Sequence, residues 1–478
     1  MALDMVSADA IGAALAKQKA ANIRDGIPSA EKRTEWLDKT IDLLVTHGDD
    51  LNKAMADDFG HRSVDQSGLT DIASSIGALK HSKKHVKKWM RPEKRGVDFP
   101  LNLLGSKAHV QFQPKGVVGI ISPWNFPVNL TFAPLANVFA AGNRAMIKPS
   151  EFTEATSALM KTLFEKYFTD EEVVVVTGGP DVGAAFSQQP FDHLIFTGAT
   201  SVAKHVMRAA AENLVPLTLE LGGKSPVVLG QSADLEKAAS RIMAGKTLNA
   251  GQICLAPDYA FVPEDKTRDF IGAAQGSVEK MFPTGLKDND DYTSIVNQRH
   301  YDRLNSYLDD ARDKGAEVIE INPAGENFSQ QPHHKMAPHI VVNPTDDMKV
   351  MQDEIFGPIL PIKSYKQTSD AVAYINENPR PLGLYYFGQD AKERDMVLNN
   401  TTSGGVTVND VIFHVAQEEL PFGGIGPAGM GSYHGYDGFL EFSHRKAIYT
   451  QTGSEMLAMM RPPYGETFRK QVAGRIKK

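Results

Sequence analysis

The sequence predicts an α/β protein that contains two parallel sheets. Three observations support this fold class. From Gly116 onward, short apolar runs such as 116–122 (GVVGIIS) and 193–196 (HLIF) alternate with segments of helical periodicity. A second alternating region runs from Pro226 to about Val415, which indicates a second sheet. Apolar runs without polar alternation are typical of parallel strands that helices cover on both faces.

The segment before Gly116 is expected to be mostly helical. Apolar residues recur at helical spacing over 36–45 and again over 69–79, which places helices within residues 8–96. Residues 80–95 are strongly basic, and we interpret them as a solvated helix face because the whole chain is acidic. Residues 97–117 look extended, and Ala108–Gln113 alternates as a strand does.

The two alternating regions divide into individual elements. In the first we expect strands at 116–122, 145–151, 173–179, 193–200 and 216–223, with helices at 131–141, 153–167 and 201–212. In the second we expect strands at 226–230, 259–263, 339–342, 357–365 and 405–409, with helices at 234–248, 266–281, 298–314 and 368–376. Ligands of such sheets bind beyond the carboxyl ends of the strands. Candidate site residues are therefore sought at those ends.

Composition excludes several classes of protein. The net charge of −7 argues against general affinity for nucleic acid, and no window reaches about 18 uninterrupted apolar residues, so we expect no transmembrane helix. The amino-terminal residues, with an early Asp4, do not form a secretory signal. The single cysteine excludes an intramolecular disulfide and suits a reducing compartment, which predicts a cytoplasmic protein. The fourteen histidines show no zinc spacing, so we expect no metal site.

The single cysteine, Cys254, lies in the small-residue segment 249–256 (NAGQICLA), which Pro257 follows. Glycine and proline around it predict a turn, which can hold a thiol at the mouth of a cleft. A catalytic thiol needs help to ionise, because a free cysteine has a pKa of roughly 8.5. Taken alone, Cys254 is better interpreted as a small buried apolar residue.

Polar side chains at the expected strand ends provide further candidates. Asn125 can donate a hydrogen bond to an oxyanion, and a turn asparagine is an equal alternative. Lys148 and Glu151 suit ribose hydroxyls, although a solvated salt bridge explains them as well. Glu220 lies in the apolar segment LTLELGG, where burial would raise its pKa and suit it to take a proton from water. Glu354 can reach a sugar hydroxyl, or it is simply a loop carboxylate.

Two formal nucleotide-binding patterns do not fit their expected context. Gly424–Gly429 satisfies the G-x-G-x-x-G pattern, but no long strand precedes it and Pro427 disturbs a helix start. Gly223-Lys224-Ser225 resembles the end of a phosphate loop, but the first required glycine is replaced by Thr218. We therefore interpret both as ordinary glycine-containing loops.

Taken together, these segments resemble the aldehyde dehydrogenase superfamily. They occur in the order and at about the spacing of that family over roughly 300 residues. Residues CLAPDY after the cysteine and GMGSYHG near the end resemble its class 3 branch and, within it, the bacterial enzymes that act on coniferyl aldehyde. The matching segments are 123–127 (PWNFP), 148–151 (KPSE), 196–200 (FTGAT), 219–226 (LELGGKSP), 251–254 (GQIC), 354–358 (EIFGP) and 421–426 (PFGGIG).

The resemblance implies a role for each candidate. Cys254 is the nucleophile, Glu220 is the general base, and Asn125 with the Cys254 N–H forms the oxyanion hole. Lys148 and Glu151 hold the adenine ribose, and Glu354 with Phe356 positions the nicotinamide end of NAD, with NADP as a possible alternative. The other cofactor-binding residues that it implies are Trp124, Ser150, Thr197, Gly198, Ala199 and Leu221. Ala199 replaces the serine of many family members, and Ala203 replaces a glycine.

The resemblance also implies a domain division and an oligomer. Residues 1–106 and 118–222 form a Rossmann-like cofactor-binding domain, and residues 223–415 form the catalytic domain. Residues 107–117 and 416–442 form a small β oligomerisation arm of a homodimer. Residues 443–478 remain as a C-terminal extension, expected to be a surface arm or partly disordered.

The implied activity is NAD(P)-dependent oxidation of an aldehyde to a carboxylic acid through a cysteine thioester. The expected substrate is an aromatic aldehyde such as coniferyl aldehyde, with ferulate as the product. Trp124, Phe126 and Phe413 are expected to line an apolar tunnel to Cys254. A medium- or long-chain fatty aldehyde is the alternative substrate. A coenzyme A-acylating enzyme and a non-catalytic scaffold are further alternatives, and Glu220 favours release of the product by water.

Overall fold

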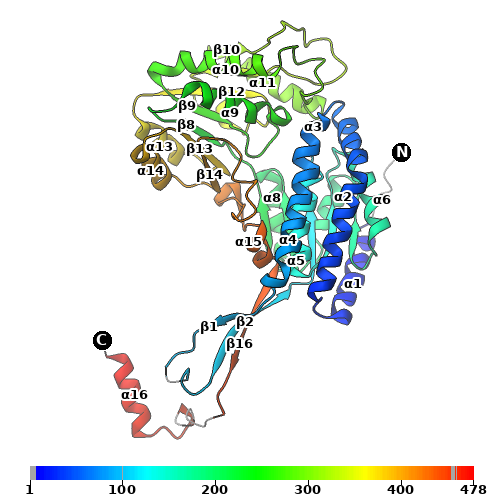
Figure 1. The fold of residues 1–478 in the computed structure, drawn as a ribbon, viewed down its shortest axis with the longest axis vertical. Coiled ribbons are helices and arrows are strands. Elements are labelled where there is room, and N and C mark those ends of the chain that lie inside the picture. The colour runs from blue at the N-terminus through cyan, green and yellow to red at the C-terminus, as the bar shows by residue number, and fades with distance from the viewer. Residues whose placement is uncertain (1–6, 100, 454–457, 459, 478) are drawn as a thin grey trace. The chain divides into compact units, whose positions relative to one another are not determined.

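A computed structural model describes residues 7–99, 101–453, 458 and 460–477 (Figure 1). Expectations for residues 1–6, 100, 454–457, 459 and 478 lie outside these residues. The chain divides into two compact units. The first comprises residues 1–89 and 114–443, and the second comprises residues 90–113 and 444–478. The α/β fold class is confirmed by the sheets and helices of the first unit.

The first unit contains a six-stranded sheet with the strand order β15-β7-β6-β3-β4-β5. Five strands run parallel, and β15 is antiparallel to β7. After β3, the chain adds β4 on one side of β3, and it later adds β6 on the opposite side of β3. Ligands of open parallel sheets bind where the strand order reverses in this way. The strands are β3 (Val117–Ile121), β4 (Arg144–Lys148), β5 (Val173–Val175), β6 (His193–Thr197), β7 (Leu217–Glu220) and β15 (Gly429–Met430).

Helices cover both faces of this sheet. On one face, strand residues such as Met146 and Leu194 pack with α1, α7 and α8 in one apolar cluster. Strand side chains alternate between faces, so residues such as Val118 point to the other face, where α2, α4, α5 and α6 pack together. The helices are α1 (Ala8–Asp25), α2 (Ala30–Phe59), α3 (Val64–Ser67), α4 (Ser74–Trp89), α5 (Asn129–Ala141), α6 (Glu154–Tyr167), α7 (Pro180–Ser187) and α8 (Thr200–Ala211), with a π-helical turn η1 (Gly68–Ala73) between α3 and α4.

The first unit also contains a seven-stranded sheet with the strand order β10-β11-β12-β9-β8-β13-β14. All neighbouring pairs are parallel except β10 with β11. Its strands are β8 (Pro226–Leu229), β9 (Tyr259–Pro263), β10 (Glu317–Glu320), β11 (His339–Val342), β12 (Ile359–Tyr365), β13 (Gly383–Phe387) and β14 (Gly405–Val408). Its helices are α9 (Leu235–Thr247), α10 (Thr267–Met281), α11 (Gln298–Asp313), α12 (Lys349–Gln352), α13 (Thr368–Glu377) and α14 (Ala391–Asn400), with short turns η2 (Leu248–Gly251) and η3 (Glu264–Lys266).

The second unit is a three-stranded sheet with the order β1-β2-β16, followed by an exposed helix. Its elements are β1 (Glu93–Arg95), β2 (Lys107–Pro114), β16 (Ser443–Thr450) and α16 (Glu466–Ile476). The third strand therefore comes from 443–450, which we had assigned to the C-terminal extension. Most β16 side chains are exposed, so its apolar pattern is weak and did not predict a strand.

Residues 416–442 were expected in the arm, and here the structure differs from the prediction. They belong to the first unit, where β15 pairs with β7 and α15 (Gly435–Glu441) packs against α4 and α5, after the turn η4 (Gly426–Ala428). Close packing explains this placement, because a Cβ at Gly438 would collide with the side chain of Asn137. The glycine at this position therefore allows the segment to pack closely against α5.

A buried ion pair connects the N-terminal helices to the loop after β3. Arg62 donates to Asp71 at 2.7 Å, and Asp71 accepts from the N–H groups of Val128 at 3.2 Å and Asn129 at 3.1 Å. Arg62 also donates to the carbonyl of Asn125 at 2.6 Å. Both charged side chains are buried, so each depends on the other for compensation of its lost hydration.

We expect Arg62→Ala to lower the free energy of unfolding by about 3–5 kcal/mol, because it leaves Asp71 buried without its cation. Urea denaturation followed by circular dichroism measures this loss. Arg268→Ala is the matched control, since Arg268 pairs with Glu317 on the surface. An exposed pair contributes about 1 kcal/mol or less. Equal losses in the two variants would contradict the importance of the buried pair.

Candidate active site

Cys254 follows α9 and η2, in the loop that leads into β9. Asn249, Ala250 and Gly251 all have positive φ angles, of 47°, 50° and 72°. Left-handed backbone costs roughly 1–2 kcal/mol for each residue with a Cβ, so neighbouring contacts must hold it. At Gly251 a Cβ would collide with the carbonyl of Gly357, which explains the glycine. The loop turns sharply at Cys254, a partly exposed residue.

Gln252 holds this loop in place through its buried side chain. Its Nε2 donates to the carbonyls of Asn249 and Ser294, each at 3.0 Å, and its Oε1 accepts from the N–H of Val296 at 3.0 Å. A buried amide with satisfied donors and acceptor restricts the backbone on which it sits. The position of Cys254, two residues later, is fixed by these bonds.

Asn125 reaches the same loop from the six-stranded sheet. Its Nδ2 donates to the carbonyl of Gln252 at 3.1 Å. Its own carbonyl accepts from Asn249 Nδ2 at 3.1 Å and from Arg62 at 2.6 Å. A side-chain amide nitrogen carries two N–H donors, and the bond to Gln252 uses one of them. The structure thus places a polarised amide beside the loop of the cysteine.

Glu220 is the last residue of β7 and is 2 % exposed. Neither of its carboxylate oxygens has a hydrogen-bond partner within the described part of the chain. Burial raises the pKa of Glu220 well above its usual value, and negative charge on Glu441 adds to the rise. An unpaired buried carboxyl group destabilises a fold, so its presence at a strand end favours a functional reason over a structural one.

Two carboxyl groups act on the Cys254 thiol. Desolvation raises the pKa of Cys254 to about 12, and negative charge on Glu354 and on Glu220 adds to the rise. The N–H groups of Cys254 and Leu255 oppose it. The resting thiol is therefore protonated at neutral pH. A carboxylate of raised pKa is suited to accept such a proton.

Glu354 lies between α12 and β12, against the exit of β7. A Cβ at Gly222 would overlap the Glu354 carboxylate, so this glycine permits the close approach. Glu354 Oε1 is buried and has no hydrogen-bond partner among the described residues. Burial raises the pKa of Glu354 to about 8, and the charge of Asp258 adds to this shift. The carboxyl group is thus available to a hydroxyl donor.

Lys246 is a buried neighbour that sequence reasoning missed. Its Nζ has no hydrogen-bond partner among the residues that the structure describes. Burial lowers the pKa of Lys246 to about 8, and the charges of Asp258 and Glu354 oppose this shift. A signal was present, because Ile242 and Met243 form the buried stripe of α9 and Lys246 continues it at helical spacing.

The residues after β4 form a compact polar group. Lys148 is buried, and its Nζ donates to Glu151 Oε2 at 3.1 Å and to the carbonyl of Pro149 at 3.0 Å. Burial lowers the pKa of Lys148, and Glu151 opposes the shift. Ser150 accepts from Ser157 through its carbonyl at 3.0 Å. The structure thus pairs Lys148 with Glu151 at a strand end, with the carboxylate partly exposed.

Backbone hydrogen bonds connect the carboxyl ends of β6 and β7. Gly198 donates from its N–H to the carbonyl of Glu220 at 3.1 Å, and Thr197 pairs with Glu220 across the two strands. Leu221 donates to the carbonyl of Ala428 at 3.0 Å. Ala199 is the N-cap residue of α8 and offers no side-chain cap. The first N–H groups of α8 are therefore available to an anion.

Aromatic side chains gather between the two sheets. Trp124 lies 5.3 Å from Phe356 and 5.2 Å from His300, measured between ring centroids. Phe356 has a φ angle of 49°, a left-handed conformation that is unusual for an aromatic residue. Phe126 lies over the guanidinium of Arg62, and the Phe413 side chain is exposed. The three aromatic residues expected to line one tunnel thus have different surroundings.

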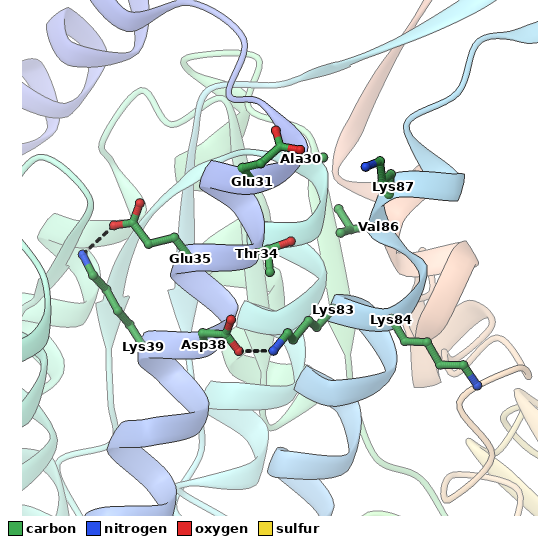
Figure 2. Close-up of a pocket in the computed structure, with 10 residues that line it drawn as sticks. All are labelled: Ala30, Glu31, Thr34, Glu35, Asp38, Lys39, Lys83, Lys84, Val86 and Lys87. Carbon is green, nitrogen blue, oxygen red and sulfur yellow. Dashed lines mark ion pairs between the residues drawn. The ribbon is translucent and has the colours of Figure 1, made fainter.

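A surface hollow of about 680 Å³ lies between α2 and α4 (Figure 2). Its charged side chains pair with each other: Lys39 contacts Glu35 at 3.0 Å, and Lys83 contacts Asp38 at 2.6 Å (Figure 2). These pairs include part of the basic stretch 80–95, which α4 exposes as predicted. None of the predicted site residues lines this hollow, so we assign it no catalytic role. Within the described residues, no helix is long and apolar enough to cross a membrane.

The model of the aldehyde dehydrogenase family matches residues 4–448. The chain is 66% identical to a Caulobacter vibrioides protein named "Probable coniferyl aldehyde dehydrogenase", over 97% of this chain and 96% of the relative. It is 53% identical to the coniferyl aldehyde dehydrogenase of Pseudomonas sp. strain HR199, over 96% of this chain and 95% of the relative.

Solved structures give the same result. The substrate-bound state of Staphylococcus aureus AldH superposes with a TM-score of 0.91 at 35% identity, covering 98% of this chain and 99% of the other. The NAD-dependent aldehyde dehydrogenase of Sinorhizobium meliloti has a TM-score of 0.85 at 26% identity, and the match covers 96% of this chain and 89% of the other. The family model and the long, close relatives lead to one conclusion: the chain belongs to the aldehyde dehydrogenase family.

Proposed function

We propose that this enzyme oxidises coniferyl aldehyde to ferulate, with NAD as the preferred cofactor and NADP as an alternative. The observation that carries the proposal is the buried, unpaired Glu220 carboxyl, whose charge acts on the only cysteine. A base and a thiol in this arrangement suit thioester formation followed by hydrolysis. The choice of substrate rests on the relatives named for coniferyl aldehyde.

The residues present fit a nicotinamide dinucleotide. The uncapped start of α8 suits the pyrophosphate, the pair of Lys148 and Glu151 suits a ribose, and the unpaired Oε1 of Glu354 suits a hydroxyl donor. Glu151 favours NAD, because a 2′-phosphate would repel its carboxylate. The bound cofactor supplies the acceptor for the hydride that the oxidation releases.

The thiol reacts only after it loses its proton. When an aldehyde lies against Cys254, the Glu220 carboxylate takes the thiol proton and the sulfur adds to the carbonyl carbon. The carbonyl oxygen becomes an oxyanion, and the remaining N–H of Asn125 with the backbone N–H of Cys254 stabilises it. Loss of hydride from this adduct restores the carbonyl and leaves a thioester on Cys254.

Hydrolysis completes the cycle. Glu220, after its proton has passed to solvent, removes a proton from a water molecule, which adds to the thioester carbonyl. The carbon–sulfur bond breaks, the acid leaves, and the thiolate regains a proton. The net reaction converts aldehyde, oxidised cofactor and water into acid, reduced cofactor and one proton. A coenzyme A-acylating reaction needs no such base, so the position of Glu220 argues against that alternative.

We also propose that the enzyme is a cytoplasmic homodimer and that the second unit forms its interface. The three-stranded sheet exposes most of β16, and Phe99 and Leu103 are 74% and 75% exposed. A small sheet that buries few side chains is marginally stable without further packing. Exposed apolar side chains of this kind favour contact with a second chain.

A substrate panel tests the proposed activity. We expect kcat/KM for coniferyl aldehyde to exceed that for acetaldehyde by roughly 10- to 200-fold, because the conjugated ring gains apolar burial. Benzaldehyde and hexanal complete the panel, and NADH absorbance without coenzyme A is the readout. Cys254→Ala should show no turnover with any aldehyde. Hexanal exceeding coniferyl aldehyde about tenfold would favour a fatty aldehyde, and dependence on coenzyme A would overturn hydrolysis.

Glu220→Gln should separate the two halves of the reaction. The amide keeps the shape but cannot take a proton from water, so deacylation slows and an acyl-enzyme accumulates. We expect a burst of reduced cofactor near one equivalent, followed by a slow steady state. Rapid mixing with mass spectrometry of the intact chain detects both. Normal steady-state turnover would contradict the assignment of Glu220, while loss of the burst would show that Glu220 is needed for thiolate formation.

Glu354→Gln should make the free thiol more acidic. The negative charge of Glu354 raises the pKa of Cys254, so removing that charge lowers the pKa of the thiol. The effect should appear above about pH 8, where the Glu354 carboxyl ionises. Iodoacetamide alkylation rates against pH report the thiol alone, because Cys254 is the only cysteine. The control Glu377→Gln, on the exposed end of α13, should leave the profile unchanged, and an unchanged Glu354→Gln profile would contradict the coupling.

A further inference from the structure

Helix α4 carries two histidines one turn apart, and a carboxylate from a distant segment lies beside them. His81 and His85 have the i, i+4 spacing that places two side chains on one helix face. Glu419 comes from the loop before β15. One ligand atom from each of these three side chains lies within 4.8 Å of the others. All three residues are outside the site of Cys254.

The His81 nitrogen and the Glu419 oxygen are arranged as two ligands rather than as donor and acceptor. His81 Nε2 lies 3.1 Å from Glu419 Oε1. The nitrogen is nevertheless buried without a hydrogen-bond partner among the described residues, because the angles do not suit a hydrogen bond. Two ligands of a tetrahedral zinc ion are about 3.3 Å apart, as follows from metal–ligand bonds of about 2.0–2.1 Å. The observed separation is close to that value.

The second imidazole is held by its other nitrogen. His85 Nδ1 lies 3.0 Å from the carbonyl of His81, which assigns the proton to Nδ1 and leaves a lone pair on Nε2. Trp89 stacks on the His85 ring at 5.5 Å between centroids. Metal-binding histidines commonly donate their second nitrogen to a carbonyl in this way, which orients the ring.

We propose that His81, His85 and Glu419 form a binding site for a divalent transition-metal ion of the zinc type. Two imidazoles and one carboxylate are a ligand set that zinc accepts, with a fourth position open to water. Glu419 is exposed, so the ion can enter from solvent. This proposal departs from the sequence-based expectation of no metal site, because Glu419 is 334 residues beyond His85 and only the fold brings it close.

The bound ion would connect two parts of the first unit. Helix α4 packs against α2, α5 and α15, and Glu419 begins the segment that forms β15 and α15. Strand β15 pairs with β7 at Glu220. Metal binding therefore restrains the segment that flanks the catalytic base, without supplying a ligand to the reaction itself.

Zinc titration of the full-length, untagged enzyme tests the site. Calorimetry is performed on the Cys254→Ser variant, so that the thiol cannot bind the metal. We expect one Zn²⁺ ion per chain, and His81→Gln, His85→Gln and Glu419→Gln in that background should each weaken binding about tenfold or more. His205→Gln is the matched control, because His205 is exposed on α8 and has no place in the cluster. Its affinity should equal that of the parent.

Cobalt provides an independent measurement of the same site. Bound Co²⁺ should give visible absorption of a four-coordinate nitrogen and oxygen site and should quench Trp89, which stacks on His85. Both signals should be absent in folded His85→Gln, as checked by circular dichroism. Absence of stoichiometric binding up to about a hundred micromolar metal, or equal affinity in the parent and the three ligand variants, would overturn the proposal.

Discussion

The proposed catalytic centre depends on one buried group of hydrogen bonds around Asn125. Its side chain binds the carbonyl of Gln252, and its carbonyl is bound by Asn249 and Arg62. These contacts link the exit of β3, in one sheet, to the cysteine loop, in the other. The left-handed backbone at 249–251 is unfavourable by itself, so these bonds keep the loop in its turned conformation. The thiol and the amide are therefore positioned together by one set of interactions.

Burial determines the chemistry of the groups gathered there. Glu220, Glu354 and Lys246 lie in surroundings that oppose their charged forms, so burial raises the pKa values of the two carboxyl groups and lowers that of the lysine. A carboxyl group so shifted can hold or release a proton near physiological pH. In the absence of substrate, the same environment keeps the thiol protonated.

Local patterns predicted much of this fold, and their failures have physical causes. Buried strands such as β3, β6 and β8 were visible because helices cover both of their faces and leave only apolar residues. Strand β16 was missed because most of its side chains are exposed, and 416–442 was misplaced because close glycine packing leaves no periodic signal. The buried strand β13 (GLYYF) was also missed, since Gly383 and three aromatic residues resemble a loop as much as a strand.

The candidate site was predicted less completely than the fold. Cys254, Asn125, Glu220 and Glu354 are predicted because each lies at a strand end or in a turn, in a segment that resembles the family. Arg62, between α2 and α3, and Gln252, in the cysteine loop, lie in segments whose local pattern does not indicate a partner. Their importance comes from contacts such as that of Arg62 with Asn125, across 63 residues of sequence. Such pairings depend on tertiary structure and leave no trace in local spacing.

The protonated state of Cys254 also has a consequence for durability. Oxidants such as peroxide attack thiolates far faster than thiols, and oxidation beyond the sulfenic acid is irreversible for most proteins. An enzyme with one cysteine has no second thiol in its own chain with which to form a rescuing disulfide. In the proposed mechanism, the surrounding carboxylates and the desolvated loop keep the idle thiol protonated and so confine its exposure to oxidative damage to the moments of turnover.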